Sequence, residues 1–144
     1  GDVPEVEFRA MLKREFRGDA WTDSAIDEAW CSLLLDMPRE RLDLIAELGK
    51  KYRVFLLSNT NPIHVREITR RAAEMGVDFP GLFERMFLSS EMGLMKPDPA
   101  IYERVLQEAD LKPGETLFVD DSLDNILAAG SLGIQTIHLD PLGT

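Results

Sequence analysis

Polar side chains suited to phosphate or metal chemistry follow three short apolar runs of this sequence. They are, in chain order, Ser58 and Asn59, then Lys96, then Asp120 and Asp121. In an open parallel sheet, ligands gather at the carboxyl ends of the strands. If the three apolar runs are strands of one such sheet, a hydroxyl group, a lysine and two carboxylates come to the same edge.

The adjacent carboxylates Asp120 and Asp121 carry the strongest signal. Two neighbouring carboxylates at the end of a buried strand repel each other and lose hydration, so they call for a cation or for hydrogen-bond donors. A helix cap would occupy one of them but not both. We therefore expect a metal site here, with Mg²⁺ as its ion, because magnesium binds a few carboxylates together with water and substrate phosphate.

Simpler interpretations stay open for the other residues. A serine after a strand, such as Ser58, is commonly a turn former or a helix cap, and Lys96 before a Pro-Asp-Pro turn fits a solvated loop residue. His64 and His138 have no partners that suggest a catalytic triad. Cys31 lies among apolar helix positions, where packing is the ordinary role of a cysteine.

The elements that must position these residues alternate from residue 39 onward. Asn61-Pro62 and Asp98-Pro99 each place a capping side chain before a proline, which is typical of a helix start. We expect helices at 39–50, 62–75, 99–109 and 123–132, and strands at 54–57, 86–88, 116–119 and 134–139. This alternation predicts an α/β fold with a doubly wound, Rossmann-like parallel sheet. The continuous apolar run at 54–57 indicates a strand buried on both faces.

The first part of the chain has a different character. Apolar residues at helical spacing predict a helix over 5–16, and Thr22 or Asp23 can cap a second one. Residues 1–37 therefore form a helical segment, and residues 38–144 form the α/β part.

Composition excludes several classes of protein. The 144 residues are 44% hydrophobic and 29% charged, which fits one globular domain rather than a disordered chain. A net charge of −10 argues against nucleic acid as a partner, because such a surface needs a positive field. No apolar run is long enough to span a membrane. A single cysteine excludes an intrachain disulfide and favours a reducing, cytoplasmic setting, and the oligomeric state is not indicated.

Three motifs in order resemble those of the haloacid dehalogenase-like hydrolases. They are Leu57-Ser58-Asn59-Thr60, Lys96-Pro97-Asp98-Pro99 and Phe118-Val119-Asp120-Asp121-Ser122 followed by Asn125. The residues of these motifs are most similar to those of small-molecule phosphatases with a helical cap. This subgroup includes sugar-1-phosphate phosphatases and the phosphatase domain of bifunctional epoxide hydrolases. The resemblance covers residues 39–140 and implies that residues 1–37 are part of the cap.

The resemblance also implies a role for each motif residue. Ser58 and the backbone N–H of Asn59 would bind the phosphoryl group, and Lys96 would neutralise charge beside it. Asp121 would bind Mg²⁺ directly, while Asp120 would hold a metal-bound water or pair with Lys96. Asn125 would orient this loop. The substrate would be a small phosphorylated metabolite, such as a sugar phosphate, hydrolysed through an aspartyl-phosphate.

One family motif is missing from the chain. Family members carry Asp-x-Asp, which supplies the nucleophile and the general acid, and no Asp-x-Asp occurs in these 144 residues. We therefore expect an inactive fragment of a magnesium-dependent phosphatase. The alternative is a non-catalytic module that binds a phosphorylated ligand or regulates a partner. The strand before Asp-x-Asp lies in the family between the strands that end at Ser58 and Asp120. Without it, buried backbone groups of both neighbours lose their partners, so we expect that this chain is not a stable monomer with the family's sheet. Either another segment fills the gap, or the strands at 54–57 and 116–119 close up on each other, or the gap stays open.

Overall fold

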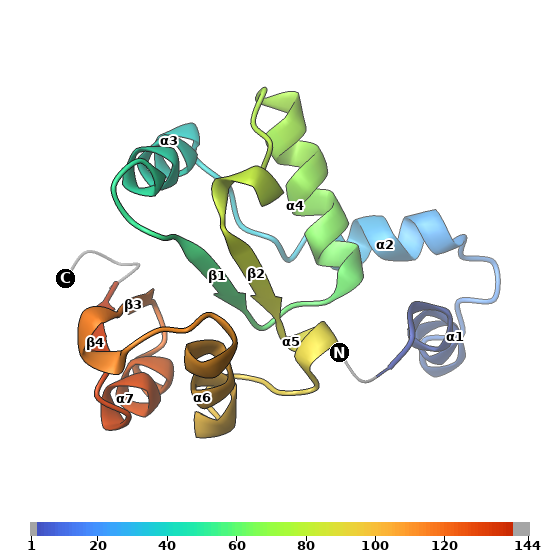
Figure 1. Cartoon of the computed structure of the whole chain (residues 1–144). Coiled ribbons are helices and arrows are strands. Elements are labelled where there is room, and N and C mark those ends of the chain that lie inside the picture. Colours follow the sequence, from blue (N-terminus) through green and yellow to red (C-terminus); the bar gives the residue numbers. More distant parts are fainter. Residues whose placement is uncertain (1–2, 140–144) are drawn as a thin grey trace. The chain divides into compact units, whose positions relative to one another are not determined.

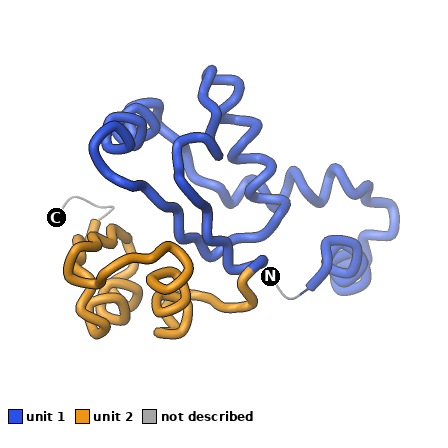
Figure 2. Tube along the Cα trace, in the orientation of Figure 1, with its two compact units in different colours: residues 1–91 blue, residues 92–144 orange. Residues whose placement is uncertain are grey.

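The computed structural model describes residues 3–139, and its chain divides into two compact units. Unit 1 comprises residues 1–91 and unit 2 comprises residues 92–144 (Figure 2). No helix among the described residues is long and apolar enough to cross a membrane.

Unit 1 consists of helices followed by one helically connected strand pair (Figure 1). Its elements are α1 (Glu5–Glu15), α2 (Asp23–Cys31), α3 (Arg39–Gly49), β1 (Phe55–Ser58), α4 (Pro62–Glu74), the 3-10 turn η1 (Pro80–Leu82), β2 (Arg85–Leu88) and, at the unit boundary, α5 (Ser89–Met92). Strands β1 and β2 pair in parallel, and Ser58 and Leu88 form the last pair of their ladder. The helices at 5–16, 39–50 and 62–75 are confirmed to within a residue or two.

Side-chain caps mark the starts of α2 and α4. Asn61 Oδ1 accepts a hydrogen bond from the N–H of His64, and Pro62 occupies the first turn of α4. Thr22 caps α2 in the same manner by accepting from the N–H of Ala25. Both caps satisfy backbone donors that have no partner within the helix, and both predicted starts are confirmed.

The core of unit 1 lies where α3 and α4 pack beside the strands. Leu42 of α3, Ala72 of α4 and Phe79 are buried together, and partly buried residues such as Ile68 and Met86 pack around them. This cluster ties the helix before β1 to the crossover helix after it, so it fixes the direction in which β1 leaves the core.

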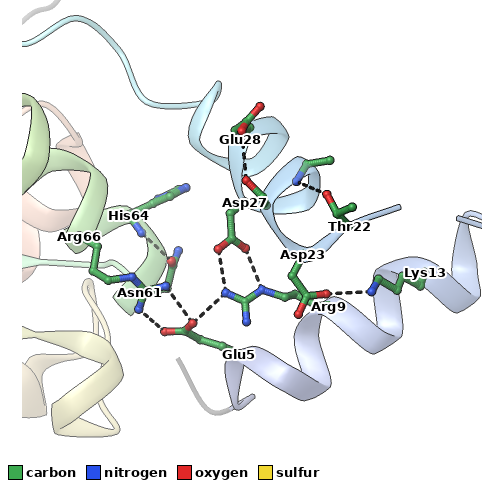
Figure 3. A network of polar contacts seen from close by, with 12 residues as sticks. Glu5, Arg9, Lys13, Thr22, Asp23, Asp27, Glu28, Asn61, His64 and Arg66 are labelled. Atoms are coloured by element: carbon green, nitrogen blue, oxygen red, sulfur yellow. Dashed lines mark hydrogen bonds and ion pairs between the residues drawn. The ribbon is translucent and has the colours of Figure 1, made fainter. Parts of the chain in front are cut away.

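Helices α1 and α2 are attached to α4 within the same unit. Arg9 of α1 donates to both carboxylate oxygens of Asp27 in α2, at 2.8 and 2.7 Å. Glu5 accepts from Arg66 of α4 at 2.6 and 2.9 Å (Figure 3). The ring of Trp30 in α2 lies against those of Phe8 and His64. The predicted boundary at residue 37 therefore falls inside a compact unit, and the role of residues 1–37 as part of a cap stays a prediction.

Unit 2 contains the second helically connected strand pair. Its elements are α6 (Pro99–Glu108), the 3-10 turn η2 (Pro113–Glu115), β3 (Leu117–Asp120), α7 (Leu123–Ser131) and β4 (Gln135–His138). Strands β3 and β4 pair in parallel, with Asp120 opposite His138. Tyr102 and Ile101 of α6 and Ala129 of α7 are almost completely buried. Tyr102 meets the ring of Phe118 edge-on at 5.4 Å between centroids.

The parallel pairing confirms the predicted α/β class, but the predicted single sheet is wrong for the described residues. The four strands form two separate two-stranded sheets, β1–β2 and β3–β4. Each crossover helix, α4 or α7, joins only the two strands of its own pair. The strand that ends at Ser58 and the strand that ends at Asp120 belong to different sheets and do not pair with each other. Accordingly β1 is half-buried rather than fully buried, and Leu117 and Val119 of β3 are exposed.

Candidate active site

Lys96 and Asp120 form a buried ion pair in unit 2. Lys96 comes from the loop before α6, and its Nζ lies 2.5 Å from Oδ2 of Asp120 at the end of β3. The two side chains are only 10% and 7% exposed. Lys96 Nζ also lies 5.5 Å from the ring centroid of Phe118. Each of these poorly hydrated charges is compensated by the other, since either one alone would carry a large desolvation cost.

The second oxygen of Asp120 is also engaged. Oδ1 accepts hydrogen bonds from the backbone N–H of Ser122 and from Nδ2 of Asn125, both at 2.9 Å. Burial by itself would raise the pKa of Asp120, but the hydrogen bonds from Lys96, Asn125 and Ser122 outweigh it. The pKa therefore lies below the ordinary value, and Asp120 stays ionised at neutral pH.

Tyr102 supports this arrangement from the core of unit 2. Its hydroxyl group donates to the backbone carbonyl of Asn125 at 3.1 Å, which helps to fix the first turn of α7. Burial raises the pKa of Tyr102 to about 12, and the nearby charge of Asp120 adds to the shift. The tyrosine consequently remains a neutral donor at physiological pH.

Asp121 offers the carboxylate that suits a hard divalent cation. Its side chain is exposed and has no hydrogen bond or ion pair with any other described residue, whereas both oxygens of Asp120 are occupied. Within residues 3–139, no three His, Cys, Asp or Glu side chains are grouped so that they could hold a metal ion. Magnesium needs only one or two carboxylates, with water and phosphate as its other ligands. Asp121 fits such an ion as a partial ligand set.

The predicted phosphate-binding residues lie in unit 1. Ser58 is the last residue of β1, and Asn59 follows it in a loop that ends at Asn61, the cap of α4. The hydroxyl group of Ser89, the first residue after β2, contacts the backbone of Thr60 in this loop. The register of the β1–β2 ladder brings these two segments together, because Ser58 is paired with Leu88.

The structure therefore divides the predicted site residues between the units. It brings Lys96, Asp120 and Asn125 into direct contact, with Asp121 next in the chain, and it places Ser58 and Asn59 on the other unit. Sequence reasoning assigned no role to two supporting residues, Ser89 and Tyr102. Ser89 directly follows a predicted strand, as Ser58 does, and that position was a usable signal. Tyr102 lies among apolar helix positions, and its sequence context gives no signal of a supporting role.

Three residues expected to be structural have structural contacts. The side chain of Cys31 is buried, and burial raises the pKa of its thiol. His64 lies inside α4, where its Nε2 donates to the carbonyl of Trp30 at 3.2 Å. His138 Nε2 makes the corresponding contact with the carbonyl of Asp121 at 3.0 Å.

Comparison with known proteins places these motifs in a family. The pattern of haloacid dehalogenase-like hydrolases matches residues 6–133. D-ribitol-5-phosphate phosphatase from Bacteroides thetaiotaomicron is 32% identical over 139 residues, which make up 96% of this chain and 67% of that protein. The chain thus spans about two thirds of this relative's length. Bifunctional epoxide hydrolase 2 from Rattus norvegicus is 30% identical over 69% of the chain and 18% of that protein.

The fold agrees with that of a solved enzyme from the same family. A wild-type enzyme from Bacteroides thetaiotaomicron, determined in complex with magnesium and inorganic phosphate, superposes with a TM-score of 0.89 at 40% identity. The match covers 94% of this chain and 69% of that enzyme. The similarity extends over both units rather than over one motif.

Proposed function

The chain belongs to the haloacid dehalogenase-like hydrolases, and from this premise we propose that it is the larger part of a magnesium-dependent phosphatase. Its substrate class is a small phosphate monoester of the sugar or sugar-alcohol kind. The proposal is supported by the ribitol-phosphate phosphatase to which the chain is similar and by the magnesium and phosphate bound to the solved relative. The observation that carries it is the buried Lys96–Asp120 pair beside the exposed carboxylate of Asp121.

The residues present have the properties that phosphoryl transfer requires. Such reactions depend on positioning and on neutralising charge more than on covalent chemistry by the protein. Ser58 would donate its hydroxyl group, and Asn59 its backbone N–H, to phosphoryl oxygens. Lys96, held by Asp120, would supply a positive charge of fixed position. Asp121 would hold a magnesium ion, which when bound offsets the negative charge of the phosphate.

The nucleophile has to come from outside these 144 residues. No Asp-x-Asp occurs in them, and the described carboxylates of the site are engaged by Lys96 or assigned to the metal. In this proposal the chain by itself binds magnesium and phosphate without turning over substrate, and the aspartyl-phosphate forms only where an Asp-x-Asp strand is joined to it.

Calorimetry on the 144-residue chain tests the proposal. We expect orthophosphate to bind only when Mg²⁺ is present and EDTA to remove the binding. Asp121→Asn should abolish magnesium binding and with it the binding of phosphate, whereas Asp124→Asn, an exposed change in the first turn of α7, should have no effect. Absence of magnesium-dependent phosphate binding in the unchanged chain would refute the proposal.

The missing motif also favours a second function, a non-catalytic module that binds a phosphorylated ligand. The two functions differ in one measurement. A protein that joins an Asp-x-Asp strand to this chain should release phosphate from D-ribitol 5-phosphate or a related sugar phosphate if the chain is part of a phosphatase. Tight binding of these compounds without release would favour the module.

A further inference from the structure

We propose that Ser89 is a positioning residue that fixes the backbone of the phosphate-binding loop, residues 58–61. The inference rests on the proposed function, because it concerns the loop assigned there to the phosphoryl group. It adds a residue outside the motifs that carry the family resemblance. The argument lies entirely within unit 1.

The hydroxyl group of Ser89 connects the two chain segments one step beyond the last backbone pair of the β1–β2 ladder. The last residue pair of β1 and β2 is Ser58 opposite Leu88. One residue further along β2, Ser89 Oγ accepts a hydrogen bond from the N–H of Thr60 at 3.0 Å and donates one to the carbonyl oxygen of Thr60 at 3.2 Å. A single hydroxyl group thus satisfies both the donor and the acceptor of one loop residue.

This double contact restrains Asn59 from its C-terminal side. On the other side, Ser58 is held by the strand ladder, and one residue beyond Thr60 the side chain of Asn61 caps α4. The backbone N–H of Asn59 therefore lies between two anchored residues. A donor that is already oriented binds an anion without a cost of reorganisation, so fixing this loop raises its affinity for phosphate.

The neighbouring serine provides a matched control. Ser89 and Ser90 are both half-buried in α5, but Ser90 Oγ has no hydrogen bond with another described residue. A comparison of Ser89→Ala with Ser90→Ala therefore separates the loss of the contact with Thr60 from any general effect of removing a hydroxyl group from the short helix. Ser89→Thr keeps the hydroxyl group and should rescue the contact.

The test measures magnesium-dependent orthophosphate binding and amide hydrogen exchange in the 144-residue chain and in three variants. We expect Ser89→Ala to weaken orthophosphate binding about 3- to 10-fold, the effect of losing ordinary hydrogen bonds, and to speed exchange at the N–H of Thr60. Ser89→Thr should stay within about 2-fold of the unchanged chain in affinity, and Ser90→Ala should match it. Urea midpoints, measured alongside, show that the variants remain folded.

The outcomes separate the inference from the proposed function. If the unchanged chain binds orthophosphate and Ser89→Ala binds it equally well, the role of Ser89 is wrong while the proposed function stands. If exchange at Thr60 quickens and the urea midpoint falls but affinity does not change, Ser89 is merely structural and the inference also fails. If the unchanged chain binds no orthophosphate with Mg²⁺, the proposed function fails and the phosphate role of Ser89 fails with it.

Discussion

Lys96 Nζ and Asp120 Oδ2 lie 2.5 Å apart, and neither side chain is more than one-tenth exposed. Such a pair gains Coulomb energy at low dielectric but loses the hydration of both ions, so its net contribution to stability is small. What it does provide is a lysine ammonium group held in one place at the end of β3.

Breaking the pair from one side should be costly. Lys96→Met leaves Asp120 buried with hydrogen bonds only from Ser122 and Asn125, and we expect a loss of about 3–5 kcal/mol in the free energy of unfolding. The double variant Lys96→Met/Asp120→Asn should recover part of it, because no unpaired charge remains. Urea denaturation measures both. Lys112→Met, which removes an exposed ion pair with Glu115, serves as the control and should cost less than about 1 kcal/mol. A Lys96→Met loss as small as the control's would contradict the argument.

Acidification should remove the contribution that the Asp120 carboxylate makes to the stability of the fold. The pKa of Asp120 is below its ordinary value in the folded protein, so on acidification the unfolded chain takes up this proton first. The stability that the carboxylate provides is therefore complete at neutral pH and is lost as the pH falls below about 4. We expect the stability gap between the unchanged chain and Asp120→Asn to narrow over this range in urea titrations at stepped pH. A gap for Asp120→Asn that is independent of pH would exclude the proposed cause.

The hydroxyl group of Tyr102 should stabilise the fold at neutral pH, and this stabilisation should disappear at high pH. Tyr102→Phe removes the hydrogen bond to the carbonyl of Asn125 and should cost about 1 kcal/mol at pH 8. An unfolded tyrosine ionises near pH 10, while the pKa of Tyr102 is raised to about 12 in the fold. The difference in unfolding free energy between the two proteins should therefore shrink as the pH rises from about 10 to about 12. Tyr52→Phe, at an exposed position, should be neutral throughout.

Helix α1 should depend on Arg9 for its attachment to unit 1. No residue of α1 is buried, and Arg9 bonds both oxygens of Asp27 and also contacts Glu5 (Figure 3). We expect Arg9→Met to increase amide hydrogen exchange along residues 5–15 while exchange in α3 stays the same. Arg14→Met removes only an exposed contact with Glu15 and is the matched control. Equal exchange in the two variants would mean that the other contacts of α1 are sufficient, namely those of Glu5 with Arg66, Lys13 with Asp23 and Phe8 with Trp30.

Local sequence signals predicted the elements of this fold well. Asn61-Pro62 and Asp98-Pro99 fix helix starts through contacts within three residues, and the structure has both caps. The four residues of α5 were not predicted, because Ser89-Ser90-Glu91-Met92 is too short to show a helical period. The division into two sheets was only partly anticipated. Pairing is a long-range property, and the apolar run at 54–57 gives no information about how many neighbours its strand has.

The candidate site was predictable as far as residue types and strand ends allow. The pairing of Lys96 with Asp120 was one of two expected roles for that aspartate, and the structure has this contact. Both adjacent carboxylates were expected to lose hydration at the end of the strand, but only Asp120 is buried and Asp121 is exposed. The contribution of Ser89 depends on strand register, which the sequence does not specify, since a shift of one residue would separate it from Thr60.

Strand pairing in this chain has a consequence for the order in which it can fold during synthesis. Phe55 pairs with Arg85 and Leu117 pairs with Gln135, so each ladder closes over its own helical crossover and inside its own unit. Contacts between residues close in sequence form faster than distant ones, and domains fold from the N-terminus as they emerge from the ribosome. The β1–β2 ladder, and with it the loop at 58–61, can therefore form before the elements of unit 2 have folded.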